Sequence, residues 1–175
     1  GGFHTGEYCR RSKSGDRVWL QATYNAILGA DGKVAKVIKI ASDISQTKRA
    51  ALETAGRIAA IDRAQAVIEF DPTGRILAAN QNFLAAVGYR LDEIAGKHHA
   101  IFMPPGEADL PAYKEFWASL RSGKLISSEF RRRTKTGADV WILASYNPVF
   151  DADGRVEKVV KYATDVTGRK LGTET

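Results

Sequence analysis

The sequence has very little cysteine and no long hydrophobic run. Cys9 is the single cysteine among 175 residues, which excludes an internal disulfide, and no Cys and His spacing suits a structural zinc. No apolar stretch approaches the roughly 20 residues of a membrane span, and the N-terminus lacks the basic and apolar regions of a signal peptide. These absences predict a globular protein of the reducing cytoplasm, and we expect no membrane contact from this segment.

Signatures of catalysis and of nucleic-acid binding are also missing. The sequence has no glycine-rich nucleotide-binding loop, and Cys9 and the three histidines are not arranged as a nucleophile with a base and an orienting group. The net charge is +6, from 26 Lys and Arg against 20 Asp and Glu, but the basic residues are scattered outside one run at Arg131–Arg133. We therefore expect neither an enzyme nor a nucleic-acid partner.

The strongest positive signal is an internal repeat. Residues 7–45 recur 122 positions later as residues 129–167, with 19 identical pairs among 39 and no gap. Chance does not produce such a match. The residues between the two copies occur only once, so we interpret the chain as the last part of one module followed by one whole module. On this interpretation the sequence begins inside a domain.

Each copy has the pattern of three antiparallel strands, and two more strands and several short helices precede the second copy. The strands predicted for the complete module are 66–70, 75–79, 129–135, 139–150 and 156–166. Between them, Asn80 is expected to start one helix and Asp109 to cap a longer one over 110–120. This order predicts an α+β fold, with a five-stranded antiparallel sheet and short helices on one face.

The segment between the copies, residues 43–63, predicts a helix because Gly56 is its single helix breaker. Its apolar stripe is narrow and consists of Ala51, Leu52, Ala55, Ile58 and Ala59. A stripe of that width suits a seam between two helices. A solvated helix that lies on its own domain explains the pattern equally well.

A set of spaced residues resembles the PAS domain, specifically the tandem PAS modules of bacterial methyl-accepting chemotaxis receptors. The residues that carry the resemblance are Asn80, Phe83, Gly88–Tyr89, Asp92–Ile94, Gly96–His99, Tyr113, Phe116–Trp117, the Lys135–Gly137 turn before Val140–Trp141, and Asp165–Thr167. The resemblance implies four segments: the C-terminal strands of a first PAS module (1–45), a linker helix (46–65), a complete second module (66–167) and the start of an output linker (168–175).

The resemblance also implies an internal binding site, for which haem b is the first cofactor candidate and a flavin ranks behind it. One group of haem-binding PAS modules takes its iron ligand from the short helical turn before the long helix, where His98 and His99 lie. Because the two residues are adjacent, at most one points inward. The alternative for either is a histidine that hydrogen-bonds the backbone or faces water.

The walls of this site are predicted to be aromatic. The candidate residues are Phe83, Phe102, Tyr113, Phe116, Trp117, Trp141 and Tyr162. Strand alternation places Phe130, either Trp141 or Ile142, and either Val160 or Tyr162 toward the helices. The same residues equally fit a core that side chains fill completely.

The end of the module matches the PAS pattern that couples the last strand to the following helix. Asp165 and Thr167 form this pattern in the complete copy, and Asp43 occupies the same place in the first copy. The carboxylate is expected to accept backbone N–H bonds at the helix start. Basic residues one turn later, Lys48 or Arg49 and Arg169 or Lys170, are expected to pair with it.

The function implied by the resemblance is a cytoplasmic sensory and signal-relay region of a chemotaxis receptor, which binds a small ligand or cofactor. The alternative is a ligand-free interaction or dimerisation module of a chemoreceptor, sensor kinase or cyclase. The expected partners are other receptor domains and a second copy of the chain. Strand exchange through residues 7–45 is one mode of pairing, because half a module leaves a sheet edge and an apolar face without a partner.

Overall fold

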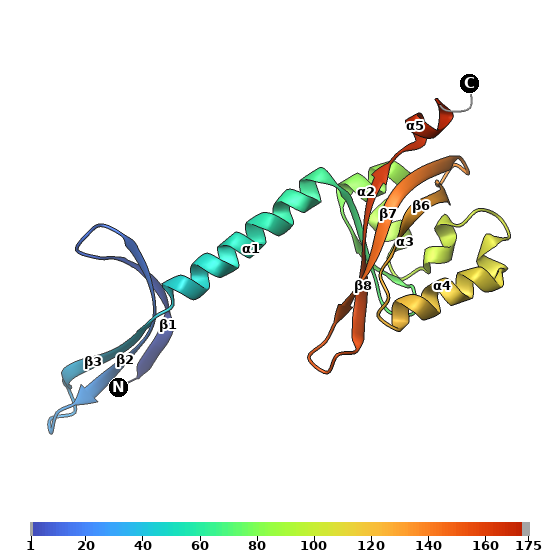
Figure 1. Ribbon diagram of the computed structural model, residues 1–175. Helices are drawn as coiled ribbons and strands as arrows, with labels where there is room; N and C mark the ends of the chain where they lie inside the picture. The colour runs from blue at the N-terminus through green and yellow to red at the C-terminus, as the bar shows by residue number, and fades with distance from the viewer. Residues whose placement is uncertain (1, 173–175) are drawn as a thin grey trace. The chain divides into compact units, whose positions relative to one another are not determined.

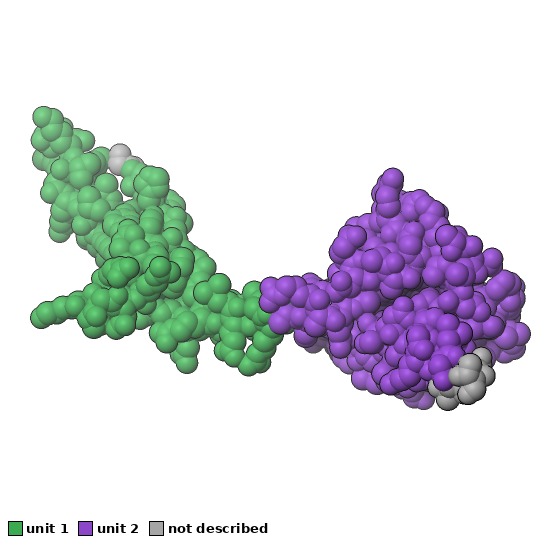
Figure 2. Space-filling model, turned by 90° about the horizontal axis from the view of Figure 1, so that it is seen from above, with its two compact units in different colours: residues 1–59 green, residues 60–175 purple. Residues whose placement is uncertain are grey.

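The computed structural model describes residues 2–172, which fall into two compact units divided between Ala59 and Ala60 (Figure 2). The first unit holds three strands and the beginning of a helix: β1 (Phe3–Arg11), β2 (Arg17–Leu28), β3 (Val34–Asp43) and α1 (Ser45–Ala64). The strands pair antiparallel in the order β1-β2-β3, as the repeat predicts. Within residues 2–172, no helix is both long enough and apolar enough to span a membrane.

The second unit contains one five-stranded antiparallel sheet in the order β5-β4-β8-β7-β6. Its strands are β4 (Ala66–Phe70), β5 (Ile76–Ala79), β6 (Ile126–Arg133), β7 (Asp139–Phe150) and β8 (Val156–Asp165). Its helices are α2 (Gln81–Val87), α3 (Leu91–Ile94), η1 (His99–Phe102), η2 (Glu107–Asp109), α4 (Pro111–Arg121) and α5 (Thr167–Leu171). The predicted α+β fold is therefore confirmed.

Helices α2, α3 and α4 lie on the same side of the five-stranded sheet (Figure 1). The core is packed between that side of the sheet and the helices, and its fully buried apolar members include Ile68, Phe70, Ile94, Phe102, Leu120 and Val159. Burial of such side chains contributes about 1.5–3 kcal/mol each, which makes this interface the main source of stability in the unit. The predicted output linker begins with α5, and its last three residues lie outside the described residues.

Two sequence predictions about this fold are wrong. Asp109 does not cap the long helix, because Leu110 occupies the N-cap and Pro111 takes the first helical position, where its missing N–H costs nothing. Neither Val160 nor Tyr162 belongs to the core face of β8. That face consists of Val159, Lys161 and Ala163, so the prediction shifted the strand by one residue.

Asn80 joins β4 to α2 through both ends of its amide. Its Oδ1 accepts hydrogen bonds from the backbone N–H of Val67 (2.9 Å) and of Phe83 (3.0 Å), and Nδ2 donates to the carbonyl of Gln65 (2.8 Å). The predicted role of Asn80 as a helix N-cap is confirmed. Gly88 ends the same helix in the left-handed conformation, with a φ of 75° that favours glycine. This short helix therefore has both ends satisfied.

Replacing Asn80 with alanine is expected to lower the free energy of unfolding by about 2–4 kcal/mol, because the change removes a cap and leaves the buried Val67 N–H without an acceptor. The matched control is Asn82→Ala, which loses bonds from an exposed amide to carbonyls at the end of α1 and to Gln65, and which should cost less than about 1 kcal/mol. Chemical denaturation of both variants measures the difference, and equal losses would contradict the assignment.

Candidate functional site

The interior of the second unit is organised around His99, which is fully buried on η1. Its Nδ1 lies 2.8 Å from the Tyr113 hydroxyl and its Nε2 lies 3.0 Å from the Tyr146 hydroxyl. The His99 ring stacks on Tyr113 and on Phe116, with ring centroids 5.8 and 6.1 Å apart, and meets Trp117 edge to face. We call this group the His99 cluster. It connects the sheet to α4 through hydrogen bonds as well as apolar contacts.

His98 lies beside the cluster and makes different contacts. Its Nε2 is 2.8 Å from the backbone carbonyl of Thr73, and its Nδ1 accepts a hydrogen bond from the N–H of Ala100 (3.1 Å). Gly74 makes room for this ring, because a Cβ there would lie 2.5 Å from Nε2. As expected from their adjacency, only one of the two histidines points inward, and the ring nitrogens of both are engaged in hydrogen bonds.

Two cations are buried next to the His99 cluster. Arg132 is 5% exposed and Lys161 is 1% exposed. The guanidinium of Arg132 donates from Nη2 to the Tyr146 hydroxyl (3.2 Å), and the Lys161 ammonium lies 4.9 Å from the centre of the Tyr146 ring. Sequence reasoning missed Arg132, Tyr146 and Lys161. The available signal was that all three are identical in both copies of the repeat.

Burial and charge control the protonation of this group. Burial lowers the pKa of His99 well below its ordinary value of 6.5, and the nearby positive charges of Lys161 and Arg132 lower it further, so the ring is neutral. Burial raises the pKa of Tyr113 to about 12, which keeps its hydroxyl protonated. Burial also acts to raise the pKa of Tyr146, but Lys161 and Arg132 outweigh it and lower that pKa.

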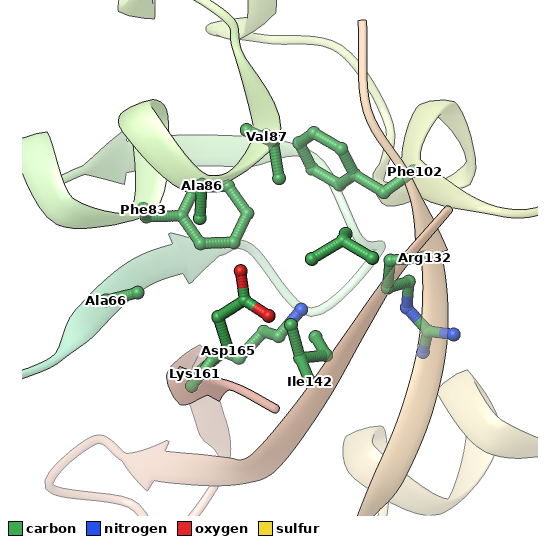
Figure 3. Close-up of a pocket in the computed structure, with 11 residues that line it drawn as sticks. Ala66, Phe83, Ala86, Val87, Phe102, Arg132, Ile142, Lys161 and Asp165 are labelled. Atoms are coloured by element: carbon green, nitrogen blue, oxygen red, sulfur yellow. The ribbon is translucent and has the colours of Figure 1, made fainter. Parts of the chain in front are cut away.

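A small cavity lies between the sheet and α2, beside the buried cations (Figure 3). Its lining residues are Ala66, Phe83, Ala86, Val87, Phe102, Arg132, Val140, Ile142, Lys161, Ala163 and Asp165. The cavity volume is about 10 Å³, which is room for roughly one water molecule. Side chains therefore fill this interior almost completely, as in the closed core that the sequence left open as an alternative.

This arrangement does not fit a haem or a flavin. Both ring nitrogens of His99 already contact tyrosine hydroxyls, and a drug-sized ligand occupies about 300–1,000 Å³. Within residues 2–172, no group of three or more metal-ligating side chains lies together. Assignment of an iron ligand to His98 or His99 remains a prediction, since it requires a more open core than this one.

The predicted wall residues separate into two groups. Phe83, Phe102, Tyr113, Phe116 and Trp117 pack together in the core around His99. Trp141 and Tyr162 do not join them, because they alternate with the core-facing residues Ile142 and Lys161 and lie on the other side of the sheet. Tyr162 lines a hollow there with Gln65.

Trp141 belongs instead to the junction between β8 and α5. The carboxylate of Asp165 accepts hydrogen bonds from the backbone N–H (2.9 Å) and the hydroxyl (2.6 Å) of Thr167. The hydroxyl of Thr167 in turn accepts the backbone N–H of Trp141 (3.0 Å). Lys170 lies 5.1 Å from the centre of the Trp141 ring and forms an ion pair of 2.5 Å with Glu129. We call this arrangement the strand-helix junction.

The first unit contains the same strand-helix junction. Asp43 accepts the backbone N–H of Ser45 (2.9 Å), and the hydroxyl of Ser45 accepts the backbone N–H of Trp19 (2.9 Å). Lys48 lies 5.1 Å from the centre of the Trp19 ring and pairs with Glu7. Two sequence copies therefore make the same contacts in the same order.

The predicted bond from each strand-end aspartate to a backbone N–H at the helix start is confirmed. Of the predicted basic partners, Arg49 adds to the Ser45 hydrogen bonds that lower the pKa of Asp43, but the two lysines need a correction. Lys48 and Lys170 pair with glutamates of the first strand of each copy, not with the aspartates. The physical reason is geometric: the helix turns each lysine back across the tryptophan ring, and the aspartate oxygen already accepts the helix N–H.

Comparison with known proteins identifies the family. The family model for the PAS fold matches residues 76–163, which is half of the chain. The chain belongs to the PAS fold family. Among solved structures it is similar to a PAS domain from Colwellia psychrerythraea (TM-score 0.58, 21% identity, covering 66% of this chain and 98% of that one). It is also similar to the Aureochrome1 light-oxygen-voltage domain (TM-score 0.54, 24% identity, covering 65% and 91%). At these identities the structural likeness shows the fold alone.

Curated relatives of this PAS chain extend over more of its length. It is 44% identical over 169 residues to the biofilm dispersion protein BdlA of Pseudomonas aeruginosa, covering 96% of this chain and 40% of that protein. It is 26% identical to the oxygen sensor protein DosP of Escherichia coli (89% and 19% covered) and 28% identical to the aerotaxis receptor of Escherichia coli (55% and 19%). The chain thus spans 40% or less of each of these relatives.

The buried neutral His99 predicts a loss of stability in acid. The unfolded chain binds a proton at this histidine below about pH 6.5 and the folded chain does not, so stability should fall as the pH drops below that value. For each pH unit below that value, the free energy of unfolding of the wild-type protein should fall by about 1.4 kcal/mol more than that of His99→Gln. Urea denaturation from pH 7.5 down to pH 5 measures it.

The control for this titration is His98→Gln, which changes the neighbouring, partly exposed ring. It should retain the acid slope of the wild-type protein. A wild-type slope that matches that of His99→Gln would show that His99 gains no proton on unfolding.

Proposed function

We propose that residues 66–167 form a sensory module of a chemotaxis-type receptor, in which a change at the His99 cluster is relayed to the helix that follows β8. The observation that carries this proposal is the strand-helix junction, where Thr167 joins the last strand, the backbone of Trp141 and the start of α5. Sensing then requires no catalysis by the module itself. The change is a shift between two arrangements of the same contacts.

The two sites are connected through the same strands. Strand β7 carries Tyr146 on its core face and Trp141 at the junction, and β8 carries Lys161 and Asp165 in the same way. A paired strand is stiff, so a displacement of Tyr146 or Lys161 also moves the residues that hold α5. The junction is weak enough to respond, since each of its hydrogen bonds contributes about 0.5–1.5 kcal/mol.

The relatives support a sensory role, because their names include an oxygen sensor and an aerotaxis receptor. We propose that the stimulus is a small ligand or a cofactor that competes for the hydrogen bonds of His99 and Tyr146. In either case the stimulus acts by favouring one arrangement of β7 and β8.

The repeated junction also supports the division of the chain into modules. We propose that residues 1–45 are the C-terminal strands of a first PAS module, residues 46–65 the helix that follows it, and residues 168–175 the start of an output linker. Each junction lies at the first residues of a helix. In this proposal, α1 receives the signal of the first module and α5 receives the signal of the second. The same strand-helix junction thus occurs twice. This repetition suits a receptor in which several domains follow one another along the chain, and the present chain covers part of such a receptor.

A second candidate function is a ligand-free interaction module, and the exposed apolar residues of α1 favour it. Leu52 and Ile58 are 66% and 56% exposed. We propose a second copy of the chain as the partner, with a helix-helix seam along α1 and exchange through residues 7–45 as the two modes of pairing. Other receptor domains are the alternative partners.

Thr167→Val and Asp165→Ala should reduce the signalling output of the whole receptor far more than its stability. Each change removes cap bonds worth only about 0.5–2 kcal/mol, well within the 5–15 kcal/mol of a typical domain. The matched control is Asp151→Ala, which breaks the same type of turn bonds in the β7–β8 loop. Output and melting temperature are measured together, and parallel losses in all three variants would refute a dedicated relay.

Pairing through α1 predicts that the chain sediments as a dimer. Leu52→Glu should shift it to monomer, because a charge in an apolar seam is costly to bury. Ala50→Glu, at an exposed position on the other side of the helix, should leave the dimer intact. Analytical ultracentrifugation measures both. A wild-type monomer whose residues 7–45 exchange their amide hydrogens rapidly would exclude the seam and the strand exchange.

A further inference from the structure

We propose that Arg132, Tyr146 and Lys161 form a binding site for a compact monovalent anion, a halide or a small carboxylate, at the edge of the core cavity. This inference rests on the proposed sensory function and names the chemical class of its ligand. We call these three residues the cation triad.

The first argument is the charge balance. Arg132 and Lys161 are both at least nine-tenths buried, yet within residues 2–172 no carboxylate lies at ion-pair distance from either. Asp165 also lines the cavity, but it is exposed and its carboxylate accepts the bonds of Thr167. A buried charge without a partner is costly, so two cations side by side favour an anion between them.

The second argument is the direction of the donors. The Lys161 ammonium points into the cavity among Phe83, Ile142 and Asp165, and the stem of Arg132 forms another wall (Figure 3). The Nε of Arg132 is buried and has no hydrogen-bond partner. Buried donors of this kind are almost always satisfied in folded proteins. The free Nε and the Lys161 ammonium supply donors for one anion, and the Tyr146 hydroxyl, which accepts from Nη2, fixes the guanidinium beside them.

The third argument is the size and lining of the space. The cavity holds about 10 Å³, which suits a particle near the size of a water molecule. Its other walls are apolar side chains such as Val87 and Phe102. A low-dielectric wall strengthens the attraction between an anion and the two cations. Polyvalent or bulky anions do not match this combination of volume and charge.

The fourth argument is the repetition of the triad. Arg10, Tyr24 and Lys39 stand at the matching positions of the first copy. Tyr24 pairs with Lys39 in the strand register as Tyr146 pairs with Lys161, and Lys39 lies 5.4 Å from the centre of the Tyr24 ring. Apolar neighbours such as Val140 and Ala144 also match their counterparts Val18 and Ala22, so the pocket wall is repeated together with the triad. The triad is unchanged in both.

The test is a thermal melt of the full 175-residue chain with increasing sodium formate, acetate, chloride or nitrate. Sodium gluconate, whose anion is too large for the cavity, keeps the ionic strength constant. A binding anion should raise the melting temperature in a saturable way, by about 5–10 °C at about 100 times its Kd. Formate and acetate report a carboxylate ligand, whereas chloride and nitrate report an inorganic one.

The variants identify the site. Lys161→Met should abolish the anion effect and should melt at or above the wild-type temperature without anion, because a buried unpaired charge is replaced by an apolar chain of similar length. Arg132→Met should also abolish the anion effect, and it decides the question if Lys161→Met does not fold. Lys124→Met removes an exposed lysine from the same unit and should keep the full effect.

Three results would overturn the site: no saturable rise with any of the four anions, the same rise in Lys161→Met, or an ultraviolet tyrosinate band at neutral pH that is lost in Tyr146→Phe. The last result would mean that Tyr146 itself supplies the negative charge. None of these three results tests the proposed relay, which the Thr167→Val variant tests separately. An intact anion effect with unchanged receptor output in Thr167→Val would refute the relay and leave the site standing.

Discussion

The structure of the second unit depends on the cost of placing polar and charged groups in a dry core. His99, Arg132 and Lys161 are all buried, and the Tyr146 hydroxyl contacts His99 and Arg132 directly. Water cannot compensate for a lost contact there, so each displaced group must find another partner. A core of apolar side chains alone would be simpler to stabilise. In the proposed sensory function, this polar cluster is retained for signalling despite its cost to stability.

The same cost bears on the proposed relay from the cluster to the strand-helix junction. Antiparallel strands alternate their side chains, so β7 and β8 each offer one face to the cluster and the other to solvent. Tyr146 and Trp141 are joined by one stiff strand, and so are Lys161 and Asp165. The strong, buried interactions therefore lie next to weak, exposed ones. In the proposed relay, a change that is costly in the core is transmitted as a small rearrangement at the strand-helix junction.

The two copies show which of these features belong to the basic plan of the module. The first unit has the same three-stranded register, the same turn between its last strand and helix, and the same Arg, Tyr and Lys. Its strand β2 even shifts register at Ile27–Leu28, the positions that match the shift at Val149–Phe150.

The sequence by itself determined the succession of strands and helices along the chain, the limits of β7 at 139–150, the Asn80 cap and the place of Asp165 and Thr167. These are local properties that periodicity and capping patterns reveal. The order of the strands within the sheet is not local, and the tertiary structure decided it. The sequence could not decide the core face of β8, since the run Val159–Ala163 is apolar on both sides of Lys161 and its alternation is ambiguous. It could not decide which histidine points inward, or that Trp141 and Tyr162 lie outside the core. Those outcomes depend on packing between strands and helices far apart in the sequence, which only the tertiary structure brings together.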